Sequence, residues 1–221
     1  MKLKHKNMKK ALYIISAVCF AALFIILCLL DNRAHHIAVA PLPTWTPDET
    51  VASGLASGVV LQEYSIQPPL VCNRTDADAL KMLDTFGVNM YQWHSRTGNR
   101  EASGLSVQII RRLNLDSPND LLKHELYLES KDEENFVHTK PEMGNINGIV
   151  FSRAYWQGVE KVSSGSYARR GFLYCTTDTA KAICISGYDR TPCSDSLCSY
   201  QPSSWQTLPV IEAAAVSFRK R

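Results

Sequence analysis

The chain has 221 residues, of which 45% are hydrophobic and 20% are charged, and its formal net charge is +3. This apolar fraction is enough to bury a globular core and excludes a disordered chain. The positive excess comes from five lysines in residues 1–10, and residues 31–221 contain 19 basic and 21 acidic residues. Nucleic acid is not an expected partner, because phosphate-binding surfaces carry a basic stripe.

An uninterrupted uncharged stretch covers residues 11–30, directly after the lysine-rich tail. As a helix rising about 1.5 Å per residue, this stretch reaches about 30 Å, the thickness of the hydrocarbon core of a bilayer. The sequence therefore predicts a cytoplasmic basic tail (1–10) and a transmembrane anchor (11–30) whose partner is the lipid bilayer. Lysines precede the span and only Arg33 follows it closely, which places the rest of the chain outside the cytoplasm.

A cleaved signal peptide is the alternative interpretation of residues 11–30. Its apolar region would normally have about 7 to 15 residues and end at a small-x-small site. The apolar run is longer, and the nearest such site, Ala38-Val39-Ala40, lies ten residues beyond Leu30. The prediction is thus an uncleaved, single-pass protein of the bacterial inner membrane with its C-terminal domain in the periplasm.

Residues 31–57 contain several Pro, Ser and Gly residues and are predicted to form an extended stalk. Residues 58–221 are predicted to form one extracytoplasmic α+β domain, with a mainly antiparallel β-sheet, one or two helices and stabilising disulfides. Alternation, turn residues and caps predict the elements of this domain in chain order. The first half should contain a strand at 59–66, a helix starting at Thr75 and stopped by Gly87, and a hairpin of strands 88–94 and 105–113. The second half should contain a helix at 118–129 capped by Ser117, a charged loop at 131–135, a meander of strands 149–156, 171–176 and 182–188, and a last segment, 210–218, that fits either period but favours a strand.

Five cysteines follow the predicted span, and four of them lie within 24 residues. In an oxidising compartment this pattern favours disulfides over zinc, because C-x2-C spacing and a neighbouring histidine are missing. The predicted pairs are Cys175 with Cys184, across a turn at residues 179–180, and Cys193 with Cys198. Other arrangements stay open, about fifteen in all. Cys72 is then a buried thiol, a link to another chain, or a replacement partner in one of these pairs.

Catalytic, metal and cofactor sites are not predicted. A G-x-S-x-G elbow is missing, and Cys72 would have to act as a reduced nucleophile beside four other cysteines. Paired carboxylates could hydrolyse glycosides only if the fold held them about 5 to 10 Å apart in a cleft. The acidic residues of this chain have a simpler explanation as helix caps and solvated faces.

Aromatic residues in predicted hairpins and loops give the best indication of a binding surface, since aromatic side chains dominate recognition hot spots. The favoured region is the segment from Tyr188 to Trp205, because a covalently braced loop loses little entropy on binding. The candidate residues are Tyr188, Tyr200, Trp205, Tyr155 and Trp156.

Two classes of function fit these features. The first is a membrane-anchored, periplasmic, protein-binding module, such as an accessory subunit of an envelope complex or an immunity-type inhibitor; the likeness to tethered immunity proteins is one of topology and size only. The alternative is an envelope hydrolase acting on cell-wall material. A deep pocket with converging titratable groups would favour the enzyme, and a braced aromatic face would favour binding.

Overall fold

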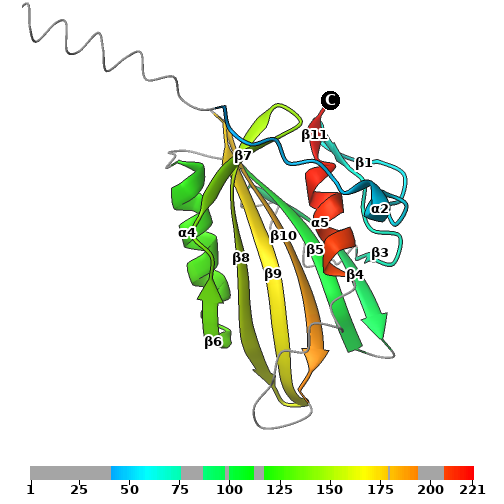
Figure 1. The fold of residues 1–221 in the computed structure, drawn as a ribbon, viewed down its shortest axis with the longest axis vertical. Coiled ribbons are helices and arrows are strands. Elements are labelled where there is room, and N and C mark those ends of the chain that lie inside the picture. Colours follow the sequence, from blue (N-terminus) through cyan, green and yellow to red (C-terminus); the bar gives the residue numbers. More distant parts are fainter. Residues whose placement is uncertain (1–40, 76–86, 98–99, 112–116, 179, 194–206) are drawn as a thin grey trace, which may run out of the picture. The chain divides into compact units, whose positions relative to one another are not determined.

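An eight-stranded antiparallel sheet organises the domain (Figure 1). The computed structural model describes residues 41–75, 87–97, 100–111, 117–178, 180–193 and 207–221, and residues 42–221 form one unit. Across the sheet the strands follow in the order β3 (Asn73–Arg74), β4 (Val88–Thr97), β5 (Arg100–Arg111), β10 (Lys181–Pro192), β9 (Gly165–Thr177), β8 (Ile149–Val162) and β6 (Glu133–His138), and β7 (Glu142–Ile146) also pairs with β8. The predicted α+β class with a mainly antiparallel sheet is confirmed.

Each face of the sheet has its own core, because successive residues of a strand point to opposite sides. On one face, helix α4 (Pro118–Glu129) packs on β8 and β9 through Leu122 and Leu126. On the other face, helix α5 (Leu208–Val216) packs on β10, β5 and β9. A small sheet of β1 (Val59–Leu61), β2 (Tyr64–Ile66) and β11 (Arg219–Lys220) contributes to the same core as α5.

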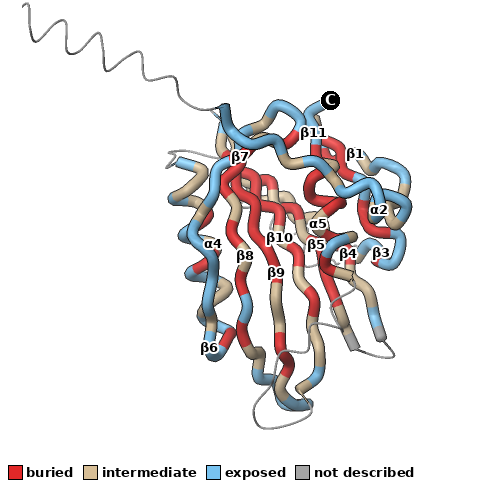
Figure 2. The backbone as a smooth tube through the Cα atoms, in the orientation of Figure 1, coloured by how far each residue is buried: buried red, intermediate tan, exposed pale blue. Residues whose placement is uncertain are grey.

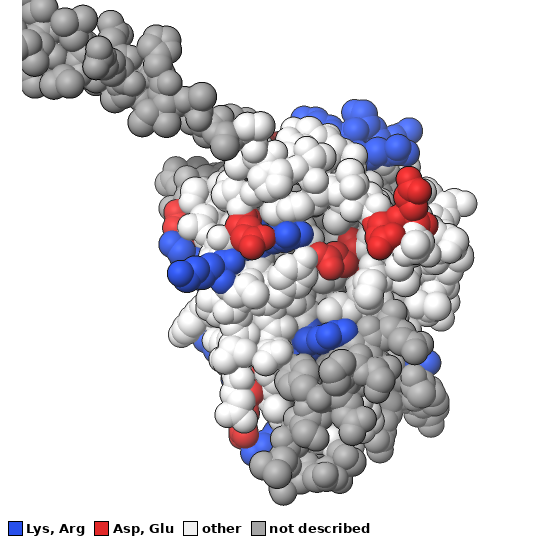
Figure 3. All heavy atoms as spheres, in the orientation of Figure 1, with Lys and Arg blue, Asp and Glu red and all other residues white. Residues whose placement is uncertain are grey.

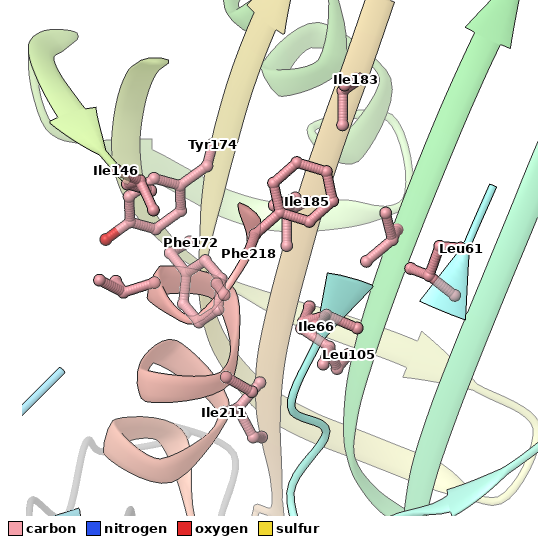
Figure 4. Close-up of a cluster of buried hydrophobic side chains, with 14 of the residues drawn as sticks. Leu61, Ile66, Leu105, Ile146, Phe172, Tyr174, Ile183, Ile185, Ile211 and Phe218 are labelled. Atoms are coloured by element: carbon pink, nitrogen blue, oxygen red, sulfur yellow. The ribbon is translucent and has the colours of Figure 1, made fainter. Parts of the chain in front are cut away.

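The core on the α5 face contains the largest buried side chains (Figure 4). Phe172 and Tyr174 of β9 lie beside Ile185 of β10, and Ile211 of α5 and Phe218 pack on them. Buried residues run along the central strands and α5, whereas the β1 edge and much of α4 are exposed (Figure 2). This core fixes α5 against the sheet, where the candidate site lies.

Helix α4 confirms the helix predicted for residues 118–129. Ser117 and Asp120 form a capping box, with the Ser117 hydroxyl accepting from the Asp120 N–H and the Asp120 carboxylate accepting from the Ser117 N–H. Pro118 stands in the first turn, where its missing N–H costs nothing. The predicted hairpin of β4 and β5 and the meander of β8, β9 and β10 are also confirmed.

Three predicted elements were wrong. Residues 59–66 form two strands instead of one, joined by a turn in which Gln62 has a positive φ of 60°. Residues 131–135 are not simply a charged loop, because β6 begins at Glu133, whose side chain is buried against Arg169. The segment favoured as a final strand is helix α5, since Pro209 in the first turn and the run Ala213–Ala215 suit a helix better than the apparent alternation suggested.

Residues 42–57 belong to the folded unit, although the stalk was predicted to extend to residue 57. Thr44 pairs with Asn145 of β7, and the Trp45 N–H donates to the Asn145 carbonyl at 2.8 Å. Asp48 then caps the short helix α2 (Glu49–Ala52). Proline-rich composition thus indicated an extended chain but not its docking on the sheet.

The predicted anchor (11–30) and the helix predicted after Thr75 lie outside the described residues. Within the described ranges, no helix has both the length and the apolar character needed to cross a membrane.

Candidate functional site

Two cavities flank α5 on its face of the sheet, which is the face seen in Figure 3. The first, of about 390 Å³, lies between the end of β6 and the start of α5. Its walls include Val137, His138, Tyr155, Arg170 and Leu208. Most of this lining is apolar, as is usual for pockets that bind ligands or side chains.

The second cavity, of about 450 Å³, lies between α5 and the segment that leads into α2. Trp45 and Asp48 line it from that segment, Arg153 lines it from β8, and Glu212 and Val216 line it from α5. These elements come from three distant parts of the sequence, so the cavity exists only when α5 and residues 44–51 are both docked.

The Glu212 carboxylate braces the wall between the two cavities. Its Oε1 atom accepts hydrogen bonds from the Tyr155 hydroxyl at 2.5 Å and the Tyr174 hydroxyl at 2.7 Å. Burial, reinforced by the neighbouring Glu212 charge, raises the pKa of Tyr155 to about 12 and raises the pKa of Tyr174 as well. Both tyrosines therefore stay protonated at neutral pH and donate continuously to the carboxylate, which ties α5 to β8 and β9.

Arg153 completes this wall from β8. Its guanidinium lies 4.2 Å from the centre of the Trp45 ring and 5.3 Å from that of Tyr155. Its Nη2 atom lies 3.1 Å from Glu142, and its Nη1 atom lies 4.0 Å from Glu212. The positive charge of Arg153 is thus already shared by two carboxylates.

Trp45 is positioned by the shape of β7. An added Cβ at Gly144 would collide with the Trp45 indole, so the missing side chain of this glycine makes the seat for the ring. The indole also meets the Tyr174 ring edge-on, with 5.5 Å between ring centres. A flat aromatic wall results on one side of the second cavity.

Asp189 of β10 supports the first turn of α5. Thr207, the residue at the N-cap, makes no side-chain cap bond, and the buried Asp189 carboxylate instead accepts from the Leu208 N–H at 2.7 Å. Burial raises the pKa of Asp189 to about 6, despite this hydrogen bond. The start of α5, and with it the Leu208 wall of the first cavity, depends on a carboxylate from the sheet.

The predicted binding residues are divided between the two faces. Tyr155 and the neighbouring Trp156 both belong to the lining of the first cavity, but Trp156 is only 3% exposed and its ring packs on Phe136 in the core beneath α4. Tyr188 lies on the α4 face too, with the Arg169 guanidinium 4.5 Å from its ring centre. Side chains of consecutive strand residues point to opposite faces, so Trp156 is mainly a core residue, although it also borders the first cavity. Tyr200 and Trp205 lie outside the described residues.

Trp45, Arg153 and Glu212 were missed by the sequence analysis. Trp45 stood in the segment interpreted as a stalk, and Arg153 stood in a strand that gave no signal of its own. Glu212 did carry a signal, because it is the single charged residue between Leu208 and Phe218. A charge in an otherwise apolar helix usually has a partner.

Cys175 and Cys184 lie directly opposite each other on β9 and β10, in the predicted register. Their sulfur atoms are 3.0 Å apart, both residues are buried beneath α4, and both are thiols in the structure. The covalent bond between them stays a prediction, as does the bridge from Cys193 to Cys198, since Cys198 is not among the described residues. Cys72 is a buried thiol whose pKa burial raises to about 11.

We expect protein isolated from its host without reductant to contain the Cys175–Cys184 bond, because the two sulfur atoms already lie side by side. After denaturation, maleimide labelling should reach neither cysteine until a reductant is added, whereas the Cys72 thiol should be labelled in both samples. Peptide mass spectrometry distinguishes the three. Labelling of Cys175 and Cys184 without reductant would contradict the predicted bridge.

A metal centre has no visible basis in the part of the chain that the structure describes, where no three His, Cys, Asp or Glu side chains gather closely enough. His138, which lines the first cavity, has its Nδ1 atom 2.8 Å from the Thr139 carbonyl oxygen. The site is thus made of aromatic, aliphatic and paired charged groups.

Comparison with known proteins gives no family model and no curated protein that matches the sequence. Solved structures with a similar arrangement include the Ran-binding protein Mog1p of Saccharomyces cerevisiae (TM-score 0.47, 11% identity, 74% of this chain and 94% of that one). They also include LpqN of Mycobacterium tuberculosis, which is involved in cell envelope biogenesis (TM-score 0.42, 12% identity, 79% and 95%). A Bacteroides thetaiotaomicron structure matches with a TM-score of 0.38 and 9% identity over 72% of this chain, which spans only 45% of that protein. At these identities and scores, no function carries over to this chain.

Proposed function

We propose that residues 42–221 form a binding module that receives a segment of a protein partner in the two cavities beside α5. The supporting observation is the braced wall between the cavities, where Glu212 holds the hydroxyl groups of Tyr155 and Tyr174 at hydrogen-bonding distance. A wall fixed before binding loses little conformational entropy on association. Cavities of about 390 and 450 Å³ are large enough for side chains of a partner to insert.

The module is proposed to act outside the cytoplasm, held at the bacterial inner membrane by the anchor predicted at residues 11–30. An immunity-type inhibitor and an accessory subunit of an envelope complex both fit this arrangement.

Photocrosslinking in the native host tests this proposal. Benzoylphenylalanine would replace Val51 in the second cavity, Val137 in the first, or Tyr127 on the exposed surface of α4 as the matched control. We expect a defined cross-linked protein from positions 51 and 137, and none from position 127. Cross-linking from Tyr127 alone, or equally from all three positions, would contradict binding at the cavities.

A further inference from the structure

The second cavity is lined by aliphatic side chains and by two carboxylates. Val51, Pro209, Ala213 and Val216 supply aliphatic surface. Asp48 and Glu212 supply negative charge from opposite sides, one at the start of α2 and the other on α5. A long side chain with an aliphatic stem and a cationic head matches this distribution of polarity.

Each carboxylate is oriented through one of its oxygen atoms. Glu212 Oε1 accepts the two tyrosine hydroxyls, and Asp48 Oδ1 accepts from the Thr50 N–H at 2.9 Å and the Thr50 hydroxyl at 2.8 Å. The other oxygen of each group has no hydrogen bond among the described residues. Fixed acceptors that still have bonding capacity favour a ligand with several N–H donors.

An anionic ligand is disfavoured by the same groups. Arg153 is the cation in the wall, and its guanidinium already interacts with Glu142, Glu212 and the Tyr174 hydroxyl. An entering carboxylate would meet Asp48 and Glu212 without a free counter-charge beside them. Figure 3 shows acidic side chains close to a basic one on this face.

We propose that the second cavity binds a lysine or arginine side chain of the protein partner. The stem lies on the aliphatic surface beside Trp45, and the cationic head donates to Asp48 and Glu212. This inference rests on the proposed function and adds the chemistry of the partner segment.

Fluorine NMR of the full chain in detergent micelles, labelled with 5-fluorotryptophan, tests the inference. The chain has four tryptophans, and Trp45→Phe identifies the Trp45 resonance. Nα-acetyl-lysine amide and Nα-acetyl-arginine amide should shift that resonance in a saturable manner. Their neutral counterparts, the norleucine and citrulline derivatives, should bind about tenfold more weakly, because they lack the charge that strengthens the hydrogen bonds.

Two variants locate the effect. Glu212→Gln and Asp48→Asn should each weaken binding of the basic derivatives about tenfold. Asp48→Asn stays informative if Glu212→Gln loosens α5, since an asparagine oxygen still caps α2. Glu134→Gln, at an exposed acid paired with Lys161 on the far edge of β6, is the matched control and should bind as the parent chain does.

Equal binding of arginine and citrulline derivatives, or unchanged binding in both carboxylate variants, would overturn the inference. If position 51 cross-linked to a partner but the Trp45 resonance did not shift, the proposed function would stand. The inference that the second cavity binds a lysine or arginine side chain would be refuted. Saturable, charge-dependent binding without any cross-link would support the chemistry of the cavity and count against the proposed function.

Discussion

The free energy of unfolding is expected to fall by about 3 kcal/mol between pH 5 and pH 7.5, because two buried carboxyls lose protons in the folded state over this range. Burial raises the pKa of Glu133 to about 7 and the pKa of Asp189 to about 6, from ordinary values of 4.5 and 3.8. In the folded state both carboxyls therefore hold protons that the unfolded chain would release. The stability they provide is complete below about pH 4 and is lost as the pH rises through 6 and 7.

Other carboxyls set the acidic limit. Hydrogen bonds from Lys181 and from the Ala180 N–H lower the pKa values of Glu63 and Asp178, so their contribution is lost at low pH. Maximum stability is consequently expected between about pH 4 and pH 5. Urea unfolding at a series of pH values, followed by circular dichroism, measures this profile.

Two substitutions assign the pH effect. Glu133→Gln and Asp189→Asn each keep an acceptor oxygen for Arg169 or for the Leu208 N–H but cannot ionise. Each should flatten the decline between pH 5 and 7.5, and the double variant should remove most of it. If the free energy of unfolding of the double variant fell as steeply between pH 5 and 7.5 as that of the parent chain, other groups would cause the effect.

Gly171→Ala is expected to destabilise the domain by about 3 kcal/mol, the upper part of the range for overpacking. A Cβ at Gly171 would collide with the Gly187 carbonyl oxygen of β10 and would approach the Trp156 ring to 2.7 Å. A side chain can rotate away from a new methyl group, but the carbonyl belongs to the paired strand. Strands β9 and β10 would have to separate locally, beside the Trp156 ring in the core beneath α4.

Gly58→Ala is the control for Gly171→Ala. Its Cβ would lie 4.0 Å from the nearest atom, an ordinary contact, so its unfolding midpoint in urea should stay close to that of the parent chain. If both alanine variants unfolded at the same urea concentration as the parent chain, the prediction that a Cβ at Gly171 collides with the Gly187 carbonyl oxygen would be wrong.

Local patterns predicted much of the sheet and little of the site. The Ser117–Asp120 capping box and the alternation along β8, β9 and β10 depend on neighbours in sequence, so they could be recognised without the fold. Even the register of Cys175 with Cys184 followed from a short turn. Helix α5 was assigned to the wrong class because a nine-residue segment that is apolar except for Glu212 suits a buried strand or a buried helix equally well.

The candidate site depends on long-range packing. The Trp45 ring is positioned by the missing side chain of Gly144 and by the Arg153 guanidinium, and neither contact produces a periodic pattern in the sequence. Tyr155 was chosen for its aromatic character and lines a cavity, whereas the same criterion chose Trp156, which borders that cavity but is buried in the core. Whether an aromatic strand residue is buried depends on which helix covers its face of the sheet. The sequence alone did not reveal how the helices are placed on the two faces.

If residues 11–30 are the membrane anchor that we propose, the docking of residues 43–46 beside β7 would limit how far the proposed binding face can lie from the lipid surface. On the proposed topology, the fourteen residues from Asp31 to Thr44 can span at most about 48 Å when fully extended. On that proposal, a partner that contacts Trp45 would have to come within about 48 Å of the bilayer, which would favour a protein that is itself embedded in the membrane or held close to it. A chain that begins at residue 58 would not be subject to this limit, and it would also lack residues 44–51, which form one side of the second cavity.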